Sequence, residues 1–187
     1  MVLEPWTDRL VSTLRRSRSQ RLRWSPVAAH YSSIMHAWGQ FEAEQGAFAE
    51  VVKRLFETGR HKTIATLRKD GSPRISGIEC TFEQGRLTFG SMPGSRKLAD
   101  LRRDPRFALH SPSIDPIEGD EATWPGEAKI AGSAVHVGAI EADGAPHGEL
   151  FTADISEVVV VHLDGTGTKL VVDWWTPAAG LRRVERE

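Results

Sequence analysis

A series of short apolar runs separated by tight-turn sequences constrains the fold more than any other feature of this chain. The first run, residues 63–67, leads into Asp70-Gly71, and Asp-Gly is a strong hairpin signal because glycine adopts positive φ without steric cost. Residues 74–82 predict the returning strand, and the turn Glu83-Gln84-Gly85 leads into another strand at residues 87–89. Strands joined by such short turns predict an antiparallel meander.

Further strands are predicted along the second half of the chain. Apolar and β-branched residues indicate them at residues 107–110, 128–137, 157–163 and 169–175. The polar stretch 141–148 is expected to break the strand pattern between them. Many short strands with few helices predict a mainly β fold, a closed antiparallel β-barrel with flanking helices, because closure removes the exposed edges of a sheet.

Helical patterns are confined to the first half of the chain. Apolar residues recur at helical spacing from Trp38 to Phe56 with charged residues between them, and Gly59 is expected to stop this helix. A second helix is predicted at residues 95–103. Asp104-Pro105 should end it, because the residue before a proline disfavours helical backbone.

The N-terminal stretch, residues 1–34, differs in composition from the rest and carries six arginines against two acidic residues. Such a basic arm could contact nucleic acid or an acidic partner, and its Arg and Ser content resembles a transit peptide. We interpret it as a poorly packed extension ahead of one domain at residues 35–187, whose length suffices for a core of its own.

Composition excludes several classes of protein. The chain has 24 basic and 25 acidic residues, a balance that argues against a general nucleic-acid binder. Its single cysteine, Cys80, excludes an internal disulfide and a multi-cysteine metal site, and no metal is expected. We find no apolar run of the ~20 residues that span a bilayer, and no signal peptide. A cytoplasmic protein without a membrane partner is therefore expected.

The strand–turn–helix junction at residues 87–97 is the candidate functional site. Its turn places the hydroxyl of Ser95 next to Arg96 and Lys97, where the second helix is predicted to begin. Hydroxyl, guanidinium and ammonium groups beside the unpaired amides of a helix start are the chemistry of a phosphate site. Arg74, on the neighbouring predicted strand, could reach the same anion. The alternative is a capped surface helix with solvated charges.

The end of the chain is a second candidate element. Trp174 and Trp175 close the last predicted strand, and an arginine-rich tail follows them. Tryptophan offers a large flat surface that suits an aromatic ligand or a subunit interface. The alternative is that one tryptophan belongs to the core and the arginines are solvated.

Three segments together resemble the pyridoxamine 5'-phosphate oxidase-like flavoproteins. They are the hairpin at residues 65–74, the turn Ser95-Arg96-Lys97, and residues 101–106, and the resemblance runs from about Met35 to the C-terminus. Members of this family are antiparallel split β-barrels that bind FMN as homodimers. The resemblance therefore implies a homodimer with FMN sites at the subunit interface, and a small-molecule substrate.

The resemblance also implies a role for individual residues. Glu127 falls where the oxidase has a glutamine that contacts the ring from the partner subunit, so the acid here is a departure. The implied FMN contacts are Ser95, Arg96 and Lys97 at the phosphate; Arg74 at the phosphate or ribityl chain; the backbone of Ile75, Ser76, Gly77 and Ile78 along the isoalloxazine; Gly90 and Ser91 at a strand end; and, across the interface, Glu127, Trp175 and one of Arg182, Arg183 and Arg186.

The resemblance favours an FMN-dependent oxidoreductase acting on a small molecule. Oxidation of pyridoxamine phosphate itself is not expected, because the oxidase's substrate-phosphate residues are not found and Leu181-Arg182-Arg183 stands where it has Arg-x-His. A deazaflavin-dependent reductase and a non-enzymatic flavin- or haem-binding protein remain alternatives. No catalytic residue is assigned: His110 is the best candidate for a general acid, and Lys129 or a C-terminal arginine for a positive charge beside the ring.

Overall fold

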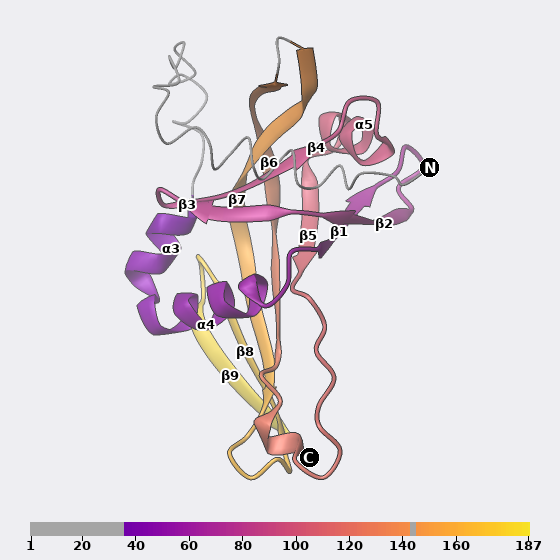
Figure 1. Cartoon of the computed structure of the whole chain (residues 1–187). Helices are drawn as coiled ribbons and strands as arrows, with labels where there is room; N and C mark the ends of the chain where they lie inside the picture. The colour runs from indigo at the N-terminus through magenta and orange to yellow at the C-terminus, as the bar shows by residue number, and fades with distance from the viewer. Residues whose placement is uncertain (1–35, 143–144) are drawn as a thin grey trace.

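The computed structural model describes residues 36–142 and 145–187, so the extension predicted at 1–34 lies outside the described residues. Antiparallel strands form most of it, with a few helices packed on the outside (Figure 1). The helices are α3 (Trp38–Glu44), α4 (Gly46–Glu57), α5 (Arg96–Arg103) and a 3₁₀ turn, Glu121–Thr123; the strands are β1 (Lys62–Leu67), β2 (Pro73–Ile78), β3 (Cys80–Glu83), β4 (Arg86–Ser91), β5 (Arg106–His110), β6 (Glu127–Ala142), β7 (Ala145–Leu163), β8 (Leu170–Thr176) and β9 (Gly180–Arg186).

The chain itself links the two ends of the main sheet. Its strand order is β2-β1-β5-β6-β7-β4-β3, and the two end strands are separated in the chain by one residue, Glu79. The strand predicted at residues 74–82 is therefore two strands, one paired with β1 and the other with β4. A single run of chain thus supplies both ends of the sheet, and the predicted mainly β barrel is confirmed.

A long hairpin, β6–β7, runs through the molecule. Its register extends from Glu127↔Val161 to Ala142↔Ala145, with bulges at three places. The expected break at residues 141–148 is wrong, because that polar stretch forms the end of the hairpin (orange, top of Figure 1). Ladder hydrogen bonds join backbone groups, so pairing continues where the side chains no longer alternate.

The C-terminal tail forms a further strand that the sequence pattern did not reveal. β8 pairs with the last part of β7, from Val158↔Trp175 to Leu163↔Leu170. β9 pairs only with β8 and forms an edge of the sheet. Its residues are almost all exposed, which removes the apolar alternation that would have identified it.

The helix predicted from Trp38 is two helices, because the chain bends at Gln45 (φ −131°, ψ 40°). The bend lets α3 bury Trp38 and Phe41 while α4 buries Leu55 and Phe56 in the same core. The Trp38 ring lies 4.4 Å from that of Phe82, between centroids. Among the described residues, no helix combines the length and apolarity needed to cross a bilayer.

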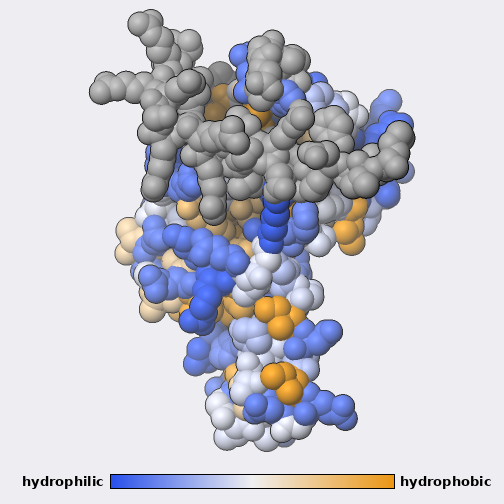
Figure 2. Space-filling view, in the orientation of Figure 1, coloured by the Kyte–Doolittle hydropathy of each residue, from blue (hydrophilic) through white to orange (hydrophobic). Residues whose placement is uncertain are grey.

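Seven large apolar side chains are exposed among the described residues. Figure 2 shows separate small hydrophobic areas among hydrophilic side chains on the lower part of the visible face. Scattered exposed apolar residues are normal for a folded protein, whereas large contiguous patches mark interfaces. The exposed large apolar side chains are Ile75, Met92, Ile114, Ile117, Leu170, Leu181 and Val184.

Candidate functional site

The start of α5 is built by two serines. Ser95 is the N-cap, and its Oγ accepts a hydrogen bond from the amide of Leu98 at 3.3 Å. The Ser91 hydroxyl, at the buried end of β4, lies 2.6 Å from the Ser95 hydroxyl. This cap leaves the amides of Arg96 and Lys97 as first-turn donors without an intrahelical acceptor. The predicted helix and its cap are confirmed.

Lys97 joins this helix start to the barrel. Its Nζ donates to the carbonyl of Gly77 on β2 at 2.9 Å. The side chain is half-buried, and burial lowers the pKa of the Lys97 ammonium. Arg96, one residue earlier, is exposed and has no hydrogen-bond or ion-pair partner in the part of the chain that the structure describes. Two cations therefore flank one set of unpaired amides.

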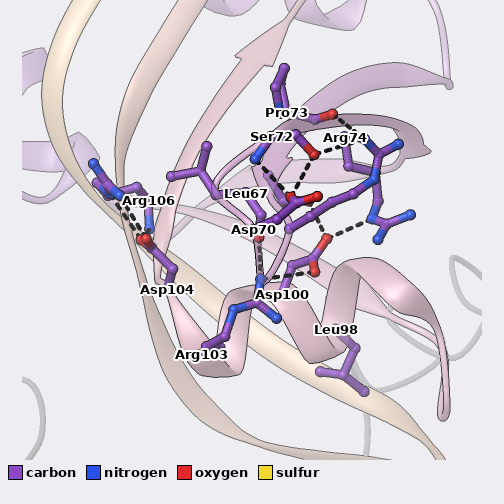
Figure 3. Close-up of polar contacts among 12 residues, drawn as sticks. Leu67, Asp70, Ser72, Pro73, Arg74, Leu98, Asp100, Arg103, Asp104 and Arg106 are labelled. Carbon is purple, nitrogen blue, oxygen red and sulfur yellow. Dashed lines mark hydrogen bonds and ion pairs between the residues drawn. The ribbon is translucent and has the colours of Figure 1, made fainter.

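Arg74 is held by a buried carboxylate that sequence reasoning missed. Its Nε lies 2.6 Å from Asp100 Oδ2, and Asp100 also accepts from Thr66 Oγ1 and Arg103 Nη2 at 3.0 Å each (Figure 3). Arg103 further donates to the Leu67 carbonyl. Burial alone would raise the pKa of Asp100, but these hydrogen bonds outweigh it and hold the pKa below its usual range. An aspartate between Leu98 and Leu101 of a short helix was the available signal.

This Asp100 cluster, made of Asp100, Arg74, Arg103 and Thr66, ties α5 to β1 and β2. Asp100 is 3% exposed and Thr66 2%. The bond from Arg74 uses Nε, so its two terminal nitrogens can still donate to a ligand. The cluster therefore sets the position of α5 and keeps a guanidinium beside β2.

A cleft of about 890 Å³ opens beside Lys97. Of the predicted site residues, Gly77, Ile78, Gly90 and Lys97 line it. A Cβ added at Gly77 would meet no atom within 4 Å. Because glycine has no side chain, the β2 backbone is uncovered at this position. The rest of the lining comes from the end of α4, the chain leading into β1, β3 and neighbouring strands: Phe56, Glu57, Thr58, Gly59, Arg60, His61, Lys62, Glu79, Cys80, Thr81, Phe82, Glu83, Thr88, Phe89, Met92, Ile140 and Leu150.

Cys80 lies in this cleft as an inert thiol. Burial raises its pKa to about 12, despite the opposing charge of Lys62. The thiol therefore stays protonated at neutral pH and is no nucleophile. Within residues 36–142 and 145–187, no group of His, Cys, Asp and Glu side chains could hold a metal ion.

Glu127 belongs to a separate polar cluster on β5 and β6. Its carboxylate lies 2.6 Å from Lys129 Nζ and 3.3 Å from His110 Nε2. Burial alone would raise the pKa of Glu127, but the hydrogen bond and charge of Lys129, with His110, lower it. None of the three residues lines the cleft of the same chain.

The C-terminal candidates also lie away from the cleft of their own chain. Trp175 is 1% exposed, with its ring 4.8 Å from that of Phe41, so it is a core residue. Arg183 is fixed by two bonds to Asp173, at 2.6 and 2.8 Å. Arg182, which pairs with Trp174 in register, is exposed.

A family profile matches this chain, and solved structures share its fold. The sequence profile described as pyridoxamine 5'-phosphate oxidase matches residues 48–144, just over half of the chain. A pyridoxamine 5'-phosphate oxidase-related, FMN-binding protein from Nostoc punctiforme superposes with a TM-score of 0.54 at 12% identity, covering 76% of this chain and 96% of that one. PhzG from Burkholderia lata, solved with tetrahydrophenazine-1-carboxylic acid, gives 0.53 at 10% identity, covering 89% and 98%.

Identities this low show a shared fold alone. A comparison with curated protein sequences finds no match. The matched profile spans β1 to β6, and thus includes the Ser95-Arg96-Lys97 turn, the Asp100 cluster and most of the cleft lining. The chain belongs to the pyridoxamine 5'-phosphate oxidase family.

Proposed function

We propose that this protein binds FMN in the cleft beside α5 and acts as an oxidoreductase on a small molecule. The observation that carries the proposal is the start of α5, where unpaired amides, two serine hydroxyls and two cations lie next to β2. That combination suits a phosphate monoester, which carries about two negative charges at neutral pH.

The donors of this site fit a phosphate. The Lys97 ammonium has three N–H donors and uses one on the Gly77 carbonyl. Arg96 is exposed, and Arg74 has terminal nitrogens to offer while Asp100 holds its Nε. A bound dianion would favour the charged form of Lys97 and raise its pKa, opposing the effect of burial.

The cleft also fits a flat ring against β2. Ile75 and Gly77 lie on the same face of β2, where Ile75 is 76% exposed and Gly77 leaves the backbone open. A volume of about 890 Å³ is at the upper end of small-molecule sites. FMN supplies redox chemistry when bound. The protein binds the phosphate, orients the ring and keeps space beside it for a substrate.

A homodimer is part of the proposal. Glu127 and Arg182 lie away from the cleft of their own chain, and β9 is an edge strand with Leu181 and Val184 exposed. We infer that a second subunit covers β9 and brings Glu127 and Arg182 to its partner's cofactor. The Trp175 side chain is buried in the core of its own chain, so it is not part of this interface. Light scattering of the purified protein should give twice the chain mass, and a monomer that binds FMN would reject this part.

The absorption spectrum of the purified protein tests the cofactor. Bound flavin gives absorption bands at ~370 and ~450 nm.

A double variant tests the phosphate site. Arg96→Ala/Lys97→Ala should weaken FMN binding by about 100-fold, because it removes two charge-assisted contacts. The control is Lys53→Ala/Arg54→Ala, an adjacent cationic pair on α4, which should leave the affinity unchanged. Equal affinities of the two variants would reject the site, and a colourless protein that binds only a deazaflavin would reject FMN.

A further inference from the structure

Glu79 occupies the point where the barrel closes. It is the single residue between β2 and β3, and it lines the cleft two residues beyond Gly77. Residues i and i+2 of an extended chain lie about 6–7 Å apart on the same face. Glu79 therefore lies just beyond the stretch of β2 against which the proposed ring would rest, in the part of the cleft left for a substrate.

The carboxylate of Glu79 is only half satisfied. Its Oε1 accepts from Arg60 Nε at 3.2 Å, and His61 Nδ1 lies 4.0 Å away. Its Oε2 is buried and has no hydrogen-bond partner, and it is the only such side-chain atom among residues 36–142 and 145–187. A buried acceptor without a donor costs free energy, so a group that donates to it gains more than an ordinary hydrogen bond would give.

The charged groups around Glu79 do not remove this deficit. Arg60 and Lys62 have partners of their own: Arg60 bonds to Glu79 Oε1, and Lys62 Nζ donates to the Arg60 carbonyl at 3.2 Å. Glu57 and Glu83, which also line the cleft, add negative charge. What this end of the cleft lacks is a donor, and a small organic molecule with an N–H group supplies one.

Glu79 can present an oxygen to such a molecule. Its side chain is 22% exposed while Oε2 itself is buried, so the carboxylate has to turn to bring this oxygen to a ligand in the cleft. The terminal torsion of glutamate is broad, so the carboxylate can turn about its last bond at little cost. Arg60 keeps one oxygen and a ligand takes the other, which satisfies both.

We propose that Glu79 selects substrates that carry a cationic nitrogen with N–H donors, such as an amine or amidine attached to a flat ring. The inference rests on the proposed function, because the ring-binding part of the cleft defines where the substrate lies. It adds a chemical class to that function. A carboxylate with a missing donor favours a protonated amidine over a neutral amide, and an amide over a carboxylate.

Three probes of nearly equal shape test this selectivity: benzamidine, benzamide and benzoate. Calorimetric titrations of the FMN-loaded and the FMN-free protein should rank them in that order. In Glu79→Gln, the affinity for benzamidine should fall at least about tenfold, which corresponds to about 1.4 kcal/mol. The affinity for benzamide should change little, because the glutamine oxygen still accepts. The affinity for FMN should stay the same.

Glu57→Gln is the matched control, because it removes an equal charge from an exposed position on the same cleft. Its effect on benzamidine should be much smaller. Tightest binding of benzoate, equal effects of the two variants, or no benzamidine binding would each overturn the Glu79 site. A protein that keeps the benzamidine preference without binding FMN would reject the proposed function alone, and one that binds FMN without the preference would reject the Glu79 site alone.

Discussion

Two carboxylates near the same cleft have opposite surroundings. Asp100, on α5, accepts three hydrogen bonds from Thr66, Arg74 and Arg103. Glu79, between β2 and β3, accepts one from Arg60 and keeps a buried oxygen without a donor. Asp100 is therefore part of the framework, whereas Glu79 is ready for a ligand. The number of donors around a buried carboxylate distinguishes these roles better than its burial does.

The largest expected difference is in stability. Asp100→Ala leaves Arg74 and Thr66 without their partner and should lower the free energy of unfolding by about 3 kcal/mol, as breaking a buried ion pair does. Glu79→Ala should cost less than about 1 kcal/mol, because it removes an unsatisfied acceptor together with one bond to a partly exposed Arg60. Urea unfolding of both variants measures the difference, and equal losses would contradict the comparison.

A smaller effect should appear in the pH dependence of stability. The pKa of Asp100 is lowered in the folded protein, so its stabilising effect is complete above the unfolded pKa of about 4 and is lost as the pH falls through the folded pKa. The stability difference between the wild type and Asp100→Asn should therefore shrink below about pH 4. Asp115→Asn is the control, since Asp115 is exposed and its side chain has no hydrogen-bond or ion-pair partner in the described part of the chain. A difference that grows in acid would be inconsistent with this role of Asp100.

The smallest effect is expected at Cys80, the neighbour of Glu79 in the sequence. Burial raises its pKa to about 12, so the thiol should react with iodoacetamide at pH 8 far more slowly than a free cysteine. Cys80→Ser should leave FMN affinity and probe selectivity unchanged. A fast reaction, detected by mass spectrometry of the native protein, would show that the Glu79 end of the cleft is more open than its half-buried residues indicate.

The elements that sequence reasoning predicted well are those set by local interactions. Asp70-Gly71 forms its hairpin because the three-residue loop 69–71, closed by the bond from Arg68 N to the Ser72 carbonyl, needs a left-handed residue at its end, and Gly71 has φ 82°. Ser95 caps α5 through an amide three residues away. Patterns were less useful where the apolar periodicity does not follow the boundaries of the element. The helix predicted from Trp38 bends at Gln45, and β9 has no apolar alternation.

The candidate site shows the same division. Sequence alone was enough to predict a strand, a turn with Ser95, Arg96 and Lys97, and a helix start with unpaired amides, because the bonds that form them join residues close in the chain. Only the tertiary structure paired Arg74 with Asp100, 26 residues away, placed Trp175 in the core, and ended β2 at Glu79. These outcomes depend on strand register and barrel closure, and both follow from packing of the whole chain.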